Sequence, residues 1–264
     1  MKLAILCQEE PVFLGPFLAE VIRLRPEQVA AVFLAGRRSA GEKHGSPRER
    51  LDALRTFWLI MEPADFLSSL AVRLRARLLG AHDPRSVAGA ARRHGIPVYR
   101  VGNPNAPEFR AQLRALPPDI VLNQSERLLK REVLSIPRLG FINRHASLLP
   151  RVRGRLAGFW SHAQEPPAYG ITIHIVDEGI DTGPIVLQRE FPDVNPAWSY
   201  PRVMRHVMRS APAMLWEAVD RLGQPGFTPQ PQSPVDEPRL FPTLSQARDY
   251  RRMLAARRLS GAPP

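Results

Sequence analysis

The sequence predicts an α/β fold with a Rossmann-like, mostly parallel sheet that has helices on both faces, followed by a short C-terminal extension. Short apolar runs of strand length alternate with segments whose apolar residues recur at helical spacing. The strand-like runs are continuously apolar, which is typical of strands that are buried on both faces. A length of 264 residues suits one large domain with a small appendage.

The first strands and helix are expected to form a βαβ unit. Residues 3–7 are an apolar run, and residues 13–22 carry apolar side chains at helical spacing. Residues 29–34 are a second apolar run, ended by Gly36. This order predicts two neighbouring parallel strands joined by a crossover helix.

A helical insertion is expected next. Residues 37–50 are polar and contain glycine, which predicts a loop, whereas residues 51–80 have helical periodicity in two pieces that break near Pro63. The second piece is rich in leucine and carries alternating arginines, Arg73, Arg75 and Arg77. Such a helix can lie on a membrane or a partner. We expect it instead to pack against the protein's own core, with its arginines extended toward solvent.

The alternation of strands and helices continues to residue 143. A short helix over residues 86–94 is closed by Gly95, at the position where a left-handed cap residue is expected. One further helix is expected at residues 109–116. Three short strands are expected at residues 96–101, 120–122 and 140–143.

The pattern changes after Pro150. Two β-rich runs, residues 171–176 and 185–189, flank the Gly-rich loop 177–184 and predict a hairpin-like pair. A long helix over residues 201–222, kinked at Pro212, closes the main domain.

The main domain is expected to end at Gly223. The remaining residues, 224–264, form a Pro-rich tail. Within it, residues 224–238 are linker-like and residues 245–258 form a short helix.

The composition narrows the class of protein. Lys and Arg total 37 against 25 Asp and Glu, so the formal net charge is +12. Such a surface attracts polyanions such as tRNA, a nucleotide-linked substrate or anionic lipid. The basic residues are scattered along the chain, so an arginine-rich composition without any such role stays open as well.

Other features of the composition exclude whole classes. The single cysteine, Cys7, rules out a disulfide framework and a cysteine-rich zinc module. No apolar run approaches the roughly 20 residues that span a bilayer, and the apolar start of the chain is too short for a signal peptide. We therefore expect a cytoplasmic protein without a transmembrane segment.

Reactive side chains concentrate between residues 143 and 181. Asn143 and His145 are two positions apart at the end of an expected strand, so both side chains point to one face at the carboxyl edge where open α/β sheets bind ligands. Asp181, in the Gly-rich loop, can supply a carboxylate to the same crevice.

An amide, an imidazole and a carboxylate suit acyl transfer. The amide can donate to an oxyanion, the imidazole can move a proton, and the carboxylate can orient the imidazole. The sequence has no Gly-x-Ser-x-Gly elbow, and Cys7 has no nucleophile context. We therefore expect a substrate amine to attack directly, without a covalent enzyme intermediate.

Two long motifs resemble one known family. Residues 140–154 are GFINRHASLLPRVRG and residues 170–185 are GITIHIVDEGIDTGPI. In this order and at this separation they resemble the signatures of the 10-formyltetrahydrofolate-dependent formyltransferases. The resemblance covers residues 118–191 well and makes residues 1–223 the catalytic domain.

The resemblance implies the roles of the site residues. Asn143 and His145 would stabilise the developing oxyanion, and Asp181 would orient the imidazole and support proton movement. The co-substrate would be 10-formyltetrahydrofolate, with no metal. Its pterin ring would lie against two segments, made up of Ser125, Arg127, Leu128 and Leu129 and of Glu178, Gly179 and Ile180.

The remaining histidines have simpler interpretations. His174 alternates with two isoleucines, so it is either a structural histidine or part of the crevice. A metal site built from His145, His174 and Asp181 is a further alternative. His162 and His206 lie in helical segments and are expected at the surface or in packing.

Departures from the family bear on the formyl acceptor. Where the purine-synthesis enzyme has a phosphate-binding loop after its first strand, this chain has two acids, Glu9 and Glu10. The initiator-tRNA enzyme has a C-terminal β-barrel domain, whereas about forty residues follow Gly223 here, which disfavours tRNA. The sequence thus predicts a small-molecule amine as acceptor, such as a nucleotide-linked amino sugar or a specialised metabolite.

Three alternatives stay open. A methionyl-tRNA formyltransferase-like enzyme would use the same trio, and so would a formyltetrahydrofolate hydrolase with water as the nucleophile. A basic RNA-binding protein without activity would show steeply salt-dependent binding. Residues 51–80 are expected to be either a homodimer face or a lid on the acceptor side.

Overall fold

The computed structural model describes residues 1–36, 46–80, 83, 85–233 and 236–261. Its centre is a seven-stranded sheet of order β3-β2-β1-β4-β5-β6-β7. Strands β1 to β5 are parallel, and β6 and β7 extend the sheet as antiparallel strands. The strand bounds are β1 Leu3–Cys7, β2 Val29–Ala35, β3 Val98–Val101, β4 Ile120–Gln124, β5 Phe141–His145, β6 Gly170–Ile175 and β7 Ile185–Glu190. The predicted fold class is confirmed.

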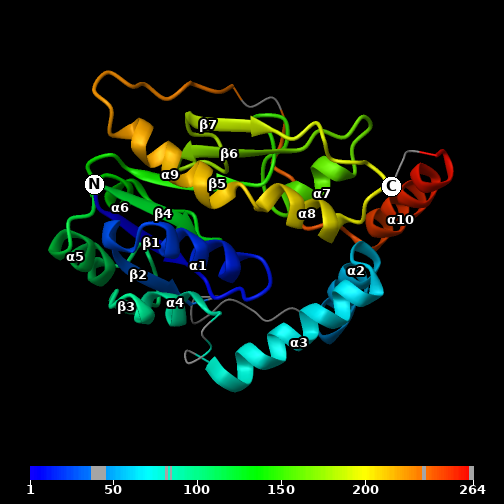
Figure 1. Cartoon of the computed structure of the whole chain (residues 1–264), viewed down its shortest axis with the longest axis horizontal. Helices are drawn as coiled ribbons and strands as arrows, with labels where there is room; N and C mark the ends of the chain where they lie inside the picture. Colours follow the sequence, from blue (N-terminus) through cyan, green and yellow to red (C-terminus); the bar gives the residue numbers. More distant parts are fainter. Residues whose placement is uncertain (37–45, 81–82, 84, 234–235, 262–264) are drawn as a thin grey trace.

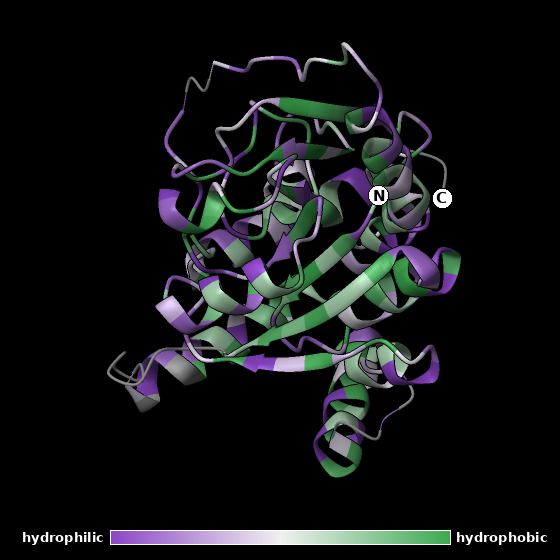
Figure 2. Ribbon diagram, turned by 90° about the vertical axis from the view of Figure 1, so that its left-hand side faces the viewer, coloured by the Kyte–Doolittle hydropathy of each residue, from purple (hydrophilic) through white to green (hydrophobic). Residues whose placement is uncertain are grey.

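Helices cover both faces of the sheet (Figure 1). Alternate residues of β1 divide between two cores: Leu3 and Ile5 pack with α1, α4 and α9, while Ala4 and Leu6 pack with α5 and the α6 segment. These helices are α1 Leu14–Leu24, α4 Val87–Arg93, α5 Pro107–Ala115, α6 Arg131–Leu134 and α9 Ala211–Leu222. Figure 2 shows the strands largely in the colours of hydrophobic residues, with purple, polar positions on the helices around them.

A third core joins distant parts of the chain beside the sheet. It contains Ile60, Phe159, Tyr200, Met204 and Tyr250. They come from three helices, α7 Ala157–His162, α8 Tyr200–Met208 and α10 Leu244–Leu259, and from the end of a fourth, α2 Pro47–Ile60. The tail helix α10 is therefore part of the folded body, packed beside α2.

The helical insertion differs from the prediction in two ways. Helix α2 begins at Pro47, inside the expected loop, because Ser46 and Glu49 form a capping box with Pro47 in the first turn. Residues 37–45 of that expected loop lie outside the described residues. The break near Pro63 is confirmed, since Pro63 begins α3 Pro63–Leu79.

Helix α3 does not bury its leucines as expected. Leu67 is 61% exposed, Leu74 59% and Leu78 76%. Its periodicity predicted a helix correctly, but an apolar stripe does not specify which neighbour covers it. The expectation that this helix packs against the protein's own core through its leucines is wrong.

The predicted long helix over residues 201–222 is two helices. α8 ends at Met208, and α9 begins at Ala211 with Pro212 in its first turn. Proline lacks an N–H group and fits the first turn of a helix, so it starts α9 and does not kink a continuous helix. The paired strands β6 and β7 around loop 177–184 are confirmed.

No helix in the described part of the chain is both long and apolar enough to cross a membrane.

Candidate active site

Three predicted side chains from two distant stretches meet at the carboxyl edge of β5. Asn143 and His145 lie on β5, and Asp181 lies in the loop between β6 and β7. Nδ1 of His145 is 3.5 Å from Oδ2 of Asp181. Nδ2 of Asn143 is 3.4 Å from Oδ1 of the same carboxylate. The geometry thus brings the amide, imidazole and carboxylate within contact of one another.

Asp181 is held in place through its backbone and its carboxylate. Its φ of 53° lies in the left-handed region, which aspartate tolerates better than most residues. The N–H of Gly154 donates to Oδ2 at 2.8 Å. Gly154 has a φ of 92°, and a Cβ there would lie 2.3 Å from the carbonyl oxygen of Arg239. Only glycine fits this close approach of two backbones.

The tail supports this loop. Nε2 of Gln232 donates to the carbonyl oxygens of Asp181, at 3.2 Å, and Gly183, at 2.5 Å. Gln230 forms a β-bridge with Ile185, and Arg239 exchanges backbone hydrogen bonds with residues beside Gly154. The prediction of a linker-like stretch over residues 224–238 is therefore wrong for its described later part, which binds the site loops.

One ring nitrogen of His145, Nε2, forms a hydrogen bond with the backbone. Its Nε2 lies 2.8 Å from the carbonyl oxygen of Val152, which can only accept, so Nε2 donates. In a neutral ring, Nδ1 then has a free lone pair directed toward Asp181. Burial lowers the pKa of His145 below its usual 6.5, and this outweighs the opposing effect of Asp181. The neutral ring is therefore the resting form near pH 7.

The carboxylate of Asp181 is ionised. Burial works to raise its pKa, but the nearby rings of His145 and His174 and the hydrogen bond from the Gly154 N–H outweigh burial and hold the pKa well below its usual range. A negative charge therefore faces Nδ1 of His145 at neutral pH, where it can stabilise a proton that arrives on that nitrogen.

His174 belongs to the same cluster, on β6. Its Nδ1 donates to the carbonyl oxygen of Ile175 at 2.8 Å. Its Nε2 lies 3.3 Å from Nδ2 of Asn143 and 3.5 Å from Asp181. Of the two alternatives that the sequence left open, the structure shows a hydrogen-bonded histidine that also lines the cluster. In the described residues no group of three or more His, Cys, Asp or Glu side chains is placed to hold a metal ion.

Sequence reasoning missed a pair that orients Asn143. Gln124, at the end of β4, donates from Nε2 to Oδ1 of Asn143, while its Oε1 accepts from Nη2 of Arg144 at 2.8 Å. Because an arginine can only donate, it fixes which end of the Gln124 amide faces Asn143. That in turn directs the NH₂ group of Asn143 toward the site.

Arg144 is half-buried and lies on the opposite face of β5 from Asn143 and His145. Its guanidinium lies 4.8 Å from the centre of the Phe17 ring, and burial lowers its pKa to about 10. It therefore keeps its charge at neutral pH. Neither composition nor residue spacing indicates the contact between Arg144 and Gln124, because that contact depends on the register of β4 and β5.

The predicted folate-binding residues have different environments. Ser125 is half-buried and bonds Oδ1 of Asn123. Leu128 is 59% exposed, whereas Leu129 is 2% exposed and packed in the core beside Phe141. Ile180 is 40% exposed, and its carbonyl oxygen accepts from Arg153 at 3.0 Å. Leu129 thus offers only backbone to a ligand, while Leu128 and Ile180 offer apolar side chains.

Arg127 is half-buried, and Glu178 and Gly179 are exposed beside Ile180 in the loop that contains Asp181. The N–H of Gly179 donates to Asp177 at 3.1 Å. His162 is buried and bonds Tyr169, and His206 pairs with Asp193, so both lie outside the cluster as expected.

Known proteins match this chain in sequence. Residues 71–219 match the family model described as formyl transferase. Methionyl-tRNA formyltransferase of Deinococcus radiodurans is 37% identical over 154 residues, which is 56% of this chain and 46% of that protein. The same enzyme of a Synechococcus species is 35% identical over 162 residues, covering 61% of this chain and 49% of that one. The chain thus spans about half the length of these curated relatives.

Solved structures agree with the fold. Glycinamide ribonucleotide transformylase 1 from Symbiobacterium toebii aligns with 88% of this chain and 94% of its own, at a TM-score of 0.55 and 19% identity. A sugar N-formyltransferase from Shewanella aligns with 88% and 73%, at a TM-score of 0.50 and 17% identity. Since the family model covers more than half of the sequence, this chain belongs to the formyl transferase family.

Proposed function

We propose that this protein transfers a formyl group from 10-formyltetrahydrofolate to a primary amine. The observation that carries the proposal is the meeting of Asn143, His145 and Asp181 within 3.5 Å at the carboxyl edge of β5. The motifs that contain these residues fall inside the segment that matches the family. Bound 10-formyltetrahydrofolate supplies a formyl group attached to a nitrogen that can leave.

The donor set fits such a group. Among the described residues, Nδ2 of Asn143 makes two contacts, both long, at 3.3 and 3.4 Å, so its N–H groups can shift to a carbonyl oxygen. Leu128 and Ile180 are exposed apolar side chains on the two segments proposed for the ring. A flat heteroaromatic ring binds where apolar side chains and backbone polar groups meet, and both segments provide them.

His145 is the proposed proton carrier. Nδ1 accepts the proton that the amine loses as its nitrogen bonds to the formyl carbon. The resulting imidazolium is stabilised by Asp181 on one side and by the Val152 carbonyl on the other. The same Nδ1 returns the proton to the folate nitrogen as the old carbon–nitrogen bond breaks. The step therefore consumes no net proton and needs no covalent enzyme intermediate.

Methionyl-tRNA is the acceptor that the relatives favour. The sequence relatives described above are methionyl-tRNA formyltransferases, and a net charge of +12 suits an RNA substrate. The sequence argument against tRNA, which relied on the residues after Gly223, is weaker than this similarity. The relatives therefore support the alternative acceptor better than the small amine that the sequence predicted.

A small phosphate-linked amine is the second candidate. A cavity of about 790 Å³ lies at the same edge of the sheet, which is a size suited to a small ligand. The likeness to a sugar N-formyltransferase shows the fold alone and does not decide between the two acceptors.

The test is a formyl-transfer assay with labelled 10-formyltetrahydrofolate. Methionyl-tRNA and a nucleotide-linked amino sugar are supplied in separate reactions, and a third reaction contains no amine. We expect label in one amine product and an at least roughly hundredfold lower kcat for His145→Ala. Release of formate without an amine would favour a hydrolase. Full turnover by His145→Ala would overturn the proposed mechanism.

A further inference from the structure

A recess lies on the same edge of the sheet as the candidate active site, at the ends of other strands. The cavity of about 790 Å³ is lined by residues that follow β1, β2 and β3, namely Glu9, Gly36 and Gly102, and by one side of α3. The five parallel strands β1 to β5 end at one edge, so this cavity and the catalytic trio open on the same side of the molecule.

The usual anion position of such a sheet is already occupied here. The N-terminus of α1 would bind an anion through its free N–H groups. The carboxylate of Glu10 accepts three of them, from Val12, Phe13 and Leu14, at 3.1, 2.7 and 3.0 Å. An external phosphate therefore cannot use these donors, and an anionic ligand must be bound elsewhere.

The cavity supplies cationic groups farther along the edge. Arg73 of α3 is paired with Glu10 at 3.3 Å. Arg77 of α3 and Arg100 of β3 also line the cavity. Glu9 lies at the β1 end, so the cavity is acidic toward the catalytic trio and basic toward β3.

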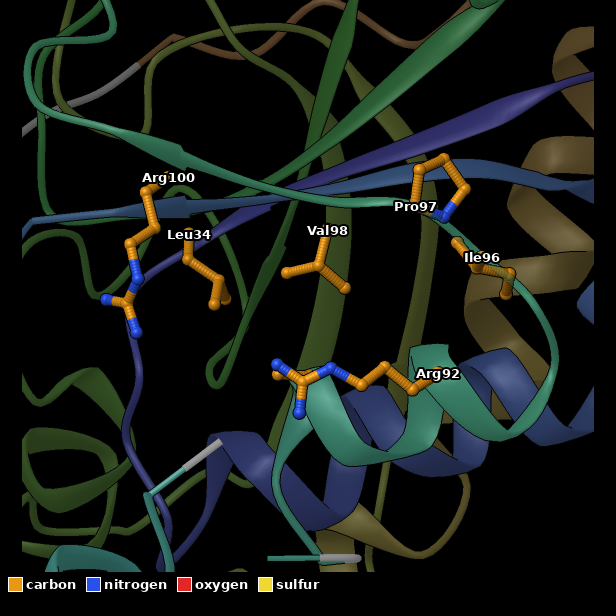
Figure 3. Close-up of a pocket in the computed structure, with 7 residues that line it drawn as sticks. Leu34, Arg92, Ile96, Pro97, Val98 and Arg100 are labelled. Carbon is orange, nitrogen blue, oxygen red and sulfur yellow. The ribbon is translucent and has the colours of Figure 1, made fainter. Parts of the chain in front are cut away.

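A smaller cavity of about 310 Å³ adjoins the first and shares Leu34 and Arg100 with it. Figure 3 shows the guanidinium groups of Arg92, from α4, and Arg100, from β3, extending into the space between these two elements. Leu34 and Val98 form its apolar wall. Guanidinium groups beside an apolar wall suit an anionic group joined to a ring or another apolar part.

We propose that this recess binds the phosphate-bearing, nucleoside part of the formyl acceptor. The proposal depends on the formyl transfer proposed above, because it assigns the amine to β5 and the phosphate to Arg77 and Arg100. From β3 to β5 the sheet crosses four strand spacings, roughly 19 Å, and from β1 to β5 roughly 10 Å. The acceptor is therefore an extended nucleoside phosphate and not a compact amine.

Two sources carry this chemistry, the 3′ end of an aminoacyl-tRNA and a nucleoside diphosphate with an amino group on its far side. The probes are accordingly the trinucleotide CpCpA and ADP, each titrated calorimetrically into the full chain. We expect one of them to bind, and Arg100→Gln to weaken that binding at least about tenfold. Arg114→Gln, an exposed arginine of α5 outside the cavities, is the matched control and leaves binding unchanged.

Tighter binding of CpCpA would identify the acceptor as an aminoacyl-tRNA, and tighter binding of ADP would identify it as a nucleoside diphosphate. If Arg100→Gln does not fold, as judged by circular dichroism, Arg77→Gln gives the same test from the other wall. The proposal is overturned if neither probe binds the unmodified chain, or if the folded variants bind as tightly as it does.

The kinetic experiment separates this proposal from the proposed function. With the preferred acceptor, Arg100→Gln should raise KM for that acceptor about tenfold and leave kcat and the KM for folate unchanged. Formyl transfer with an unaltered acceptor KM in this variant would refute the proposal that the recess binds the acceptor, and the proposed function would be unaffected. If probe binding requires Arg100 but the chain transfers no formyl group, the recess binds nucleoside phosphates and the proposed function is refuted.

Discussion

Two carboxylates at the same edge of the sheet differ in the groups that surround them. Glu10, in the turn between β1 and α1, accepts three backbone N–H groups and an arginine. Asp181, in the turn between β6 and β7, accepts one backbone N–H and faces two imidazoles and an amide. Backbone N–H groups do not exchange protons on the time scale of a reaction, whereas imidazoles do.

The surroundings give the two carboxylates different roles, Glu10 in the stability of the fold and Asp181 in the proposed proton transfer. Glu10 neutralises the start of α1 and leaves no donor for a ligand. Asp181 places a negative charge beside a nitrogen that can gain a proton and lose it again. Substitutions at the two sites should therefore affect different quantities, activity at one and stability at the other.

The largest expected effect is that of Asp181→Asn. The amide cannot stabilise an imidazolium on His145, so kcat should fall on the order of a hundredfold or more, with folate affinity retained. Steady-state kinetics and a folate-binding titration measure the two quantities. A kcat within about threefold of the unmodified enzyme would show that the carboxylate has no part in the chemistry.

The pH dependence of His145 is the next test. Burial lowers its pKa below 6.5, so the ring stays neutral to lower pH than free imidazole does. Since the neutral ring accepts the proton, kcat should rise with pH through an apparent pKa below 6.5 and be level around pH 7. Removing the negative charge in Asp181→Asn should lower this pKa further, as measured by NMR titration of the ring. A pKa above 6.5 would mean that the Asp181 charge outweighs burial.

A smaller effect is expected for Gln124→Leu, which removes the positioning of the Asn143 amide. The NH₂ group of Asn143 would lose its fixed direction, so kcat should fall about tenfold with the folate KM unchanged. In an Asn143→Ala background the same substitution should have no further effect, because there is no amide to orient. A multiplied loss in the double variant would mean that Gln124 acts independently of Asn143. Gln112→Leu, on α5, serves as the control.

The sequence predicted the trio because its members lie in two long motifs, one at a strand end and one in a Gly-rich loop. It did not predict Gln124 and Arg144, whose contact depends on how β4 and β5 align. Composition also failed for the tail. A Pro-rich segment is typical of a linker, but Gln232 bonds the backbone of Asp181. Such long-range pairing leaves no periodic trace in a sequence.

Local signals gave mixed results for the helices. The Ser46 to Glu49 capping box was present in the sequence and marks the start of α2, yet the polar composition around it favoured a loop. For α3, periodicity predicted the helix but not the exposure of its leucines. The two acids after β1 argued against a bound phosphate, and the structure shows that Glu10 is the one that occupies the helix start.

The smallest effect is expected at Glu10 itself. Glu10→Gln would replace a charge-assisted cap of α1 with a neutral one, and the free energy of unfolding should fall by about 1 kcal/mol. Because Glu10 contacts none of the trio, kcat should stay within about twofold. Chemical denaturation measures the first quantity, with Glu20→Gln on the exposed side of α1 as the control. If the variant instead bound inorganic phosphate at α1 and kept its stability, the carboxylate would be a replaceable occupant of a ligand site and not a part of the architecture.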